Sequence, residues 1–184
     1  MTRKSNPRRI PHLIQRGFTL IELLIVVIIL AILAAIVVPQ FASTTEDTKN
    51  ASLDTTLASM RAAIDLYYQQ HGKYPSAVAA TGGTCTGGGA AGTGAIDTAQ
   101  AFIDQLGMYT NAAGQACSTT NSEFKYGPYL KKATAPVNPV TNVATVEVVT
   151  TGNLNLTATG TGGGWKFDNK VGKFIANDTA LQTR

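Results

Sequence analysis

The sequence predicts an α+β protein, in which one long N-terminal helix precedes a small head built on an antiparallel sheet of three to four strands. An apolar run near the N-terminus is long enough for a membrane-spanning helix, and an apolar pattern of helical period follows it. β-Branched and aromatic residues gather in the last third of the chain. With 184 residues, there is room for about one domain.

A basic leader precedes the candidate span. Residues 18–38 would extend about 31 Å as an α-helix, close to the hydrocarbon thickness of a bilayer. Residues 1–17 carry five of the fifteen Lys and Arg residues and no acidic residue, so ten basic and eleven acidic side chains remain without them, a net charge of −1. The formal charge of +4 therefore does not support nucleic-acid binding, and the leader is typical of a cytoplasmic flank that orients a span.

Two ordinary explanations of the span remain as alternatives. A secretory signal peptide has an apolar region of about 7–15 residues followed by a small-residue cleavage site. Here the run is longer, and the alanines of residues 31–35 lie inside it. A plain signal anchor would leave Glu22 unexplained, because a carboxylate beside a bilayer-length apolar run is costly to desolvate. Glu22 therefore needs a partner, and this need points toward assembly.

Residues 17–27, with the sequence GFTLIELLIVV, resemble the N-terminal signature of the type IV pilin and pseudopilin superfamily. The resemblance implies that a prepilin peptidase cuts after Gly17 and that the new N-terminal residue, Phe18, is N-methylated. It also implies that Glu22 helps to dock subunits into a growing filament. The implied pilin fold has a cleaved leader (1–17), a long helix (18–71) whose part 18–39 is transmembrane, and a head (72–184).

Elementary chemistry agrees with these roles. A residue without a Cβ, such as Gly17, lets a peptidase approach the backbone closely. In a bundle of such helices, the N-terminal ammonium of a neighbour is the natural counter-charge for Glu22. That pair would fix the stagger between subunits. The alternative is that Glu22 pairs with its own N-terminus, which would give no register.

The helix is predicted to continue beyond the span. Pro39 cannot donate to the carbonyl of Ala35, which predicts a kink or a local loosening. Gly72 is the predicted helix stop, with Pro75 just beyond it. Apolar side chains spaced by three and four residues then predict a face that packs under the sheet. They are Leu53, Leu57, Met60, Ile64 and Tyr67.

Two further segments are similar to the major pseudopilin of type II secretion systems. The end of its helix is similar to residues 60–68 together with 72–75. The loop that follows in that protein is similar to residues 129–132, with Pro136 and Pro139 after them. The resemblance implies a subunit of a periplasmic pseudopilus that drives protein secretion. A type IV pilus subunit for adhesion, motility or DNA uptake is one alternative, and a membrane-anchored binding protein that does not polymerise is another.

The same resemblance implies partners and a location. The partners are the prepilin peptidase, copies of the chain itself and other pilins or pseudopilins, an inner-membrane assembly platform, and membrane lipid; no nucleic acid is required. The location is the bacterial inner membrane, crossed once with the N-terminus cytoplasmic and the head periplasmic, and later a pseudopilus or surface pilus.

Residues 81–95 are rich in Gly, Thr and Ala and predict a flexible surface loop. Gly87, Gly89 and Gly92 match the G-x-G-x-x-G spacing of dinucleotide-binding loops, which works only between a strand and a helix. The preceding residues make a poor strand, so the sequence gives no support to nucleotide binding. Asp97 is the predicted N-cap of a short helix that carries Ala99, Phe102, Ile103 and Leu106.

The last third of the chain is predicted to supply the sheet. Residues 143–150 are β-branched, 154–157 alternate, and 165–167 and 171–175 flank a turn at Asp168 and Asn169. Trp165 and Phe167, with Phe174 or Ile175, are expected to pack against the helix.

Cys85 and Cys117 are the two cysteines of the chain, and their spacing matches no metal motif. In an oxidising periplasm they could form a disulfide that contributes about 2–4 kcal/mol, and two free thiols are the alternative.

No metal, cofactor or catalytic group is expected. The major pseudopilin family carries an acidic, glycine-rich calcium loop near its C-terminus, whereas here Asp168 and Asp178 stand among lysines. The two histidines are His12, in the leader, and His71, which is expected to be solvated at a helix end. With no G-x-S-x-G motif and no paired His ligands, we expect no enzyme.

Overall fold

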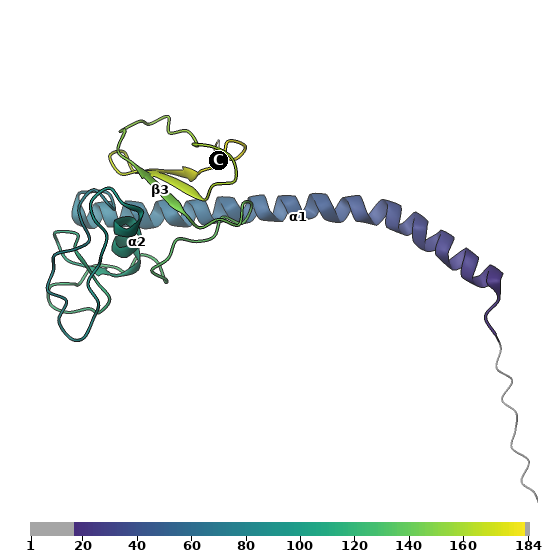
Figure 1. Cartoon of the computed structure of the whole chain (residues 1–184), viewed down its shortest axis with the longest axis horizontal. Coiled ribbons are helices and arrows are strands. Elements are labelled where there is room, and N and C mark those ends of the chain that lie inside the picture. Colours follow the sequence, from purple (N-terminus) through teal and green to yellow (C-terminus); the bar gives the residue numbers. More distant parts are fainter. Residues whose placement is uncertain (1–16, 183–184) are drawn as a thin grey trace, which may run out of the picture. The chain divides into compact units, whose positions relative to one another are not determined.

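The computed structural model describes residues 17–182, except for the side chains of Ala42 and Ser43, so the leader up to residue 16 and His12 lie outside the described residues. The chain forms two compact units, of which the first ends at Thr44. The elements, shown in Figure 1, are α1 (Leu20–His71), α2 (Ala99–Gly107), β1 (Tyr109–Thr110), β2 (Ala116–Cys117), β3 (Val146–Val149), β4 (Trp165–Asp168) and β5 (Lys173–Ala176).

The first unit consists, in its described part, of the start of α1. Its side chains are exposed from Phe18 to Phe41, although nearly all of them are apolar. Among the described helices, α1 alone is long and apolar enough to cross a membrane. The helix runs without interruption through Pro39, and a kink there stays a prediction.

The second unit is organised around the C-terminal part of α1. The predicted apolar face is confirmed, since Leu53, Leu57, Met60, Ile64 and Tyr67 are all at most 1% exposed. They join one core with aromatic side chains of α2 and the sheet. In that core the ring centroids of Phe102 and Phe167 lie 4.7 Å apart, and those of Trp165 and Phe174 lie 5.3 Å apart. Burying each large apolar side chain contributes about 1.5–3 kcal/mol.

A polar contact also joins the helix to the sheet. The Nε and Nη2 atoms of Arg61 donate to the carbonyl oxygen of Phe174 at 3.1 and 3.0 Å. The indole nitrogen of Trp165 donates to the carbonyl of Pro136 at 2.7 Å, so this buried side chain has its one polar atom satisfied. As expected, Trp165 is a packing residue.

The predicted α+β class is confirmed, but the sheet is mixed. β4 pairs with β5 antiparallel, whereas β3 pairs with β4 in parallel, with Val146 opposite Trp165. The predicted strand at residues 154–157 is wrong, because Leu154 is 71% exposed and these residues belong to a loop. This loop carries the chain from the end of β3 back to the start of β4, which makes the pair parallel.

The ends of the helices follow local signals. α1 ends at His71, and Gly72 has the left-handed φ of +65° that suits a glycine after a helix, as predicted. The predicted N-cap of α2 is wrong by one residue. Thr98 has the extended backbone of an N-cap and its side chain accepts from the Ala101 amide. Asp97 instead has a φ of +61°, and its carboxylate accepts from Asn169.

The segment of residues 81–95 is tied to its surroundings at several points. Cys85 and Cys117 form a disulfide with their Cα atoms 5.5 Å apart. The amide of Gly92 donates to the Ala116 carbonyl at 2.8 Å, and Ala80 donates to the Gly94 carbonyl at 2.9 Å. A Cβ on Gly94 would collide with the backbone of α2. This glycine therefore permits close packing and does not simply add freedom.

We predict that replacing both cysteines by serine lowers the free energy of unfolding by about 2–4 kcal/mol, because the unfolded chain loses a constraint between residues 32 apart. Urea unfolding of the two proteins, with and without reductant, checks this. Reductant should destabilise the parent protein alone. An equal effect on the serine variant would contradict the explanation.

Candidate processing and assembly site

Glu22 lies in the first turn of α1, where it caps its own helix. The backbone amide and the hydroxyl of Thr19 both donate to Glu22 Oε2, at 2.9 and 2.8 Å. In return, the amide of Glu22 donates to the Thr19 hydroxyl oxygen at 3.3 Å. This reciprocal arrangement is a capping box, which satisfies amides that the first turn of a helix leaves without partners.

The capping box has a consequence for the carboxylate. Both bonds from Thr19 reach the same oxygen, and no described donor reaches Oε1. One oxygen of Glu22 is thus held in a fixed direction while the other remains open to a second donor. The sequence carried the signal for this box, a Thr three residues before a Glu at the start of an apolar run. The ammonium predicted as the partner of Glu22 is therefore preceded by a partner within the same chain, Thr19, which the prediction missed.

The backbone before the helix is open to an enzyme. Residues 17–19 have no helical or strand assignment, and α1 begins at Leu20. Phe18 is 78% exposed, and among the described residues no atom beyond the adjoining ones lies within 4 Å of the position that a Cβ on Gly17 would take. The peptide bond between Gly17 and Phe18 therefore lies in an exposed, irregular segment, as proteolysis requires.

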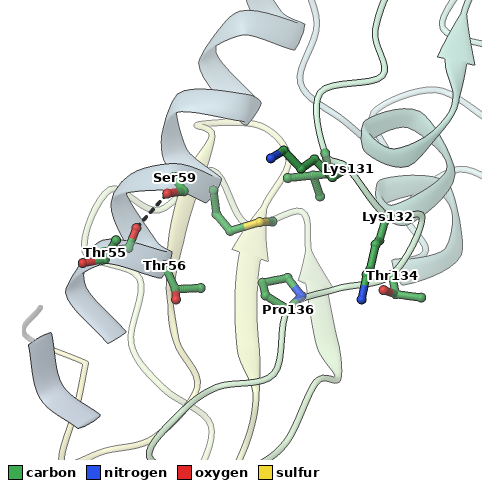
Figure 2. A pocket seen from close by; sticks show the side chains of 9 residues that line it. Thr55, Thr56, Ser59, Lys131, Lys132, Thr134 and Pro136 are labelled. Carbon is green, nitrogen blue, oxygen red and sulfur yellow. Dashed lines mark hydrogen bonds between the residues drawn. The ribbon is translucent and has the colours of Figure 1, made fainter. Parts of the chain in front are cut away.

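A hollow in the surface of the second unit could receive a partner. It has a volume of about 340 Å³ and lies between α1 and the segment of residues 130–136. Figure 2 shows Thr55 and Ser59 of α1 on one side and Lys131 and Lys132 on the other. Its lining holds no carboxylate, imidazole or thiol, and its charged side chains are the two lysines. The lining residues are Thr55, Thr56, Ser59, Met60, Leu130, Lys131, Lys132, Thr134 and Pro136.

The environment of His71 differs from the prediction of a solvated side chain. His71 is half-buried, and its Nε2 lies 3.0 Å from Thr110 Oγ1 and 3.1 Å from the Tyr129 hydroxyl. Aromatic rings surround it, with the centroids of Tyr67 and Tyr126 at 4.2 and 5.1 Å. Burial lowers the pKa of His71, and the nearby backbone of Ala112 opposes this only in part. The imidazole therefore joins the end of α1 to the rest of the head.

The described residues also bear on metal binding. Among residues 17–182, no three His, Cys, Asp or Glu side chains converge to hold a metal ion. Asp168 and Asp178 are buried, and each of their carboxylate oxygens already accepts hydrogen bonds. The donors that fill these positions leave little for a cation, which would need several free oxygens.

The long exposed apolar part of α1 and the small mixed-sheet head agree with the α+β architecture that the resemblance to pilins implies. Residues 14–38 match the prokaryotic N-terminal methylation motif. This match, and the relatives described next, confirm the resemblance to type IV pilins and pseudopilins.

The chain is similar to named secretion and pilus proteins over part of its length. It is 45% identical over 62 residues to type II secretion system core protein G of Pseudomonas aeruginosa, covering 34% of this chain and 44% of that protein. The same protein of Pectobacterium carotovorum is 37% identical over 62 residues, covering 34% and 40%. The type IV narrow pilus major component PilA5 of Thermus thermophilus is 50% identical over 48 residues, covering 26% and 41%.

The extent of these similarities is limited. The matched part spans less than half the length of each of these relatives. No solved structure matches the chain.

We predict that the head loses stability as the pH falls through the range below the ordinary His pKa of 6.5. The folded state lowers the pKa of His71, so the unfolded chain binds the proton more readily in that range and unfolding is favoured. Glu147 and Asp168 also have lowered pKa values, but their ordinary values of 4.5 and 3.8 place their effects at lower pH. Urea midpoints at pH 7.5 and 5.5 measure the difference, and His71→Gln should reduce it. An equal pH effect in that variant would assign it to other groups.

Proposed function

We propose that this chain is a structural subunit of a type IV filament-like assembly, and more specifically a pseudopilin of a type II secretion system. The observation that carries the proposal is the exposed start of α1, whose one charged residue up to Phe41 is Glu22. An exposed apolar surface of this size requires lipid or other helices. The membrane supplies the lipid before assembly. A filament whose core is a bundle of such helices then supplies the other helices.

Processing is the first step of the proposed pathway. A prepilin peptidase cuts the open segment after Gly17, which gives Phe18 a free amine that is then N-methylated. Before the cut, the nitrogen of Phe18 is a neutral amide; after it, the nitrogen carries a positive charge. The cut also removes the basic leader, so the subunit can leave the membrane without carrying five cationic side chains through it.

Glu22 then sets the register between subunits. Apolar helix surfaces pack without a strong preference for one stagger, because dispersion and burial are not directional. A carboxylate directed by its capping box, with no described donor at Oε1, can accept from the ammonium of Phe18 in a neighbour. In a low-dielectric bundle an unpaired carboxylate is costly, so staggers that leave Glu22 unpaired are disfavoured.

Similarity to core protein G, together with the helix end at residues 60–75, favours a periplasmic pseudopilus that drives secretion. The second candidate is a type IV pilus subunit, which the similarity to PilA5 favours. In both cases the subunit waits in the bacterial inner membrane, with its head periplasmic, until an assembly platform extracts it. Co-isolation with a secretion apparatus supports the first candidate, and a long surface fibre seen by microscopy supports the second.

Processing can be tested by the mass of the protein from native membranes. We predict a chain that begins at N-methylated Phe18, found by intact mass and N-terminal peptide analysis. A chain that begins at Met1, or is cut after the apolar run, would contradict this pathway and favour a signal anchor or a secreted protein.

Assembly can be tested by cysteines placed along the span. We predict that oxidative cross-linking gives a ladder of oligomers and that Glu22→Ala reduces it more than about tenfold, because removing one partner of a buried charge pair costs about 2–5 kcal/mol. The matched control is Glu46→Ala, which removes an exposed acid from the same helix beyond the span. Monomers alone in the parent protein would favour an anchored protein that works singly, and equal loss in both variants would remove the special role of Glu22.

A further inference from the structure

The loop between β3 and β4 has an unusual composition for its length. Parallel strands need a long connection, which is commonly a helix. Here residues 150–164 make the connection without helix or strand (Figure 1), and Leu156 is its one buried apolar side chain. Structureless loops of this length are uncommon within compact domains. Apolar packing therefore supplies little to hold this loop, and polar contacts must do so.

Asp168 holds the first part of the loop. Its Oδ2 accepts from the Thr151 hydroxyl at 2.5 Å and from the amides of Gly152 and Asn153 at 2.8 and 3.3 Å. Its Oδ1 accepts from the Lys170 amide at 2.9 Å. Burial raises the pKa of Asp168, but these four hydrogen bonds together lower it below its ordinary value, so the carboxylate stays charged.

Asp178 and its surroundings hold the last part. The Oδ2 of Asp178 accepts from the Gly162 amide at 2.6 Å, and its Oδ1 accepts from the Ala180 amide at 2.8 Å. The part of the loop between these two contacts is held by Glu147 of β3. Its carboxylate accepts from the Thr159 hydroxyl at 2.7 Å and forms an ion pair with Lys166. A carboxylate thus meets the loop near its start, its middle and its end.

These contacts resemble those of a metal-closed loop with the charges reversed. A cation gathers oxygen atoms around a positive charge, whereas these carboxylates gather N–H and O–H donors around negative charges. We propose that Asp168 and Asp178 fasten the two ends of the 150–164 loop in place of a bound cation, so that the head keeps its fold without calcium. This inference does not depend on whether the chain forms a pilus, a pseudopilus or neither.

The test uses the full chain in detergent micelles. Trp165 is the single tryptophan, is fully buried and follows the loop directly, so its fluorescence reports thermal unfolding at this place. The midpoint in EDTA should equal the midpoint in excess calcium chloride, because a cation bound to the folded state alone would raise it. Asp168→Asn puts an amide N–H group where the Thr151 hydroxyl and the backbone amides now donate to a carboxylate oxygen. This variant should lower the thermal midpoint by about 4 °C or more. It should also speed chymotrypsin cleavage beside the exposed Leu154.

The matched control is Asp65→Asn, which neutralises an exposed aspartate on α1 and should leave both readouts unchanged. If Asp168→Asn does not fold, Thr151→Val removes one donor and should still raise the cleavage rate. A higher midpoint with calcium would show that a cation holds the loop and would overturn the proposal. An Asp168→Asn protein that behaves like Asp65→Asn would overturn it equally.

Discussion

The second unit depends on one packing interaction, that of the apolar face of α1 with the aromatic side chains of the sheet and α2. β3, β4 and β5 are only four residues long, and β1 and β2 are two, so their ladders have few hydrogen bonds and no sheet here would be stable by itself. The helix supplies the surface on which these strands are buried, and Trp165 and Phe174 fill the space between them. The second unit therefore folds around its helix, and the irregular segments are attached to that core.

Polar side chains then attach the segments that have little apolar surface. Asn169, in the turn between β4 and β5, donates to the Ser76 hydroxyl and to the Asp97 carboxylate. Ser76 and Asp97 both have left-handed backbones, with φ of 64° and 61°, which are unfavourable for residues other than glycine. The side chain of Gln105 bonds the Ser76 amide and the carbonyls of Val78 and Gly114. These buried amide side chains take the place of regular structure in the loops.

The parts that could be predicted from sequence were those with a local physical cause. The period of Leu53, Leu57 and Met60 marked the buried face, and Gly72 marked the helix end. The parallel pairing of β3 and β4 could not be predicted, because it depends on residues 154–157 staying out of the sheet. His71 looked solvated because its partner Tyr129 is far away in sequence. Asp and Thr can both cap a helix. Thr98 is the N-cap because it has the extended backbone that this position needs, whereas Asp97 has a left-handed one. The Thr19–Glu22 capping box also has a local cause, since its two residues stand three apart at the start of an apolar run.

The contact between Arg61 and the carbonyl of Phe174 joins residues 113 apart in sequence. Closing so long a segment of chain costs conformational entropy before the contact can stabilise the fold. Domains dominated by such contacts fold slowly. Because synthesis begins at the N-terminus, the chain gains Arg61 long before Phe174. The C-terminal part of α1 therefore has no sheet to pack against until nearly the whole sequence has been made. The order of the sequence thus makes the head a late-folding unit, which stays open to proteases and chaperones until the last strands are made.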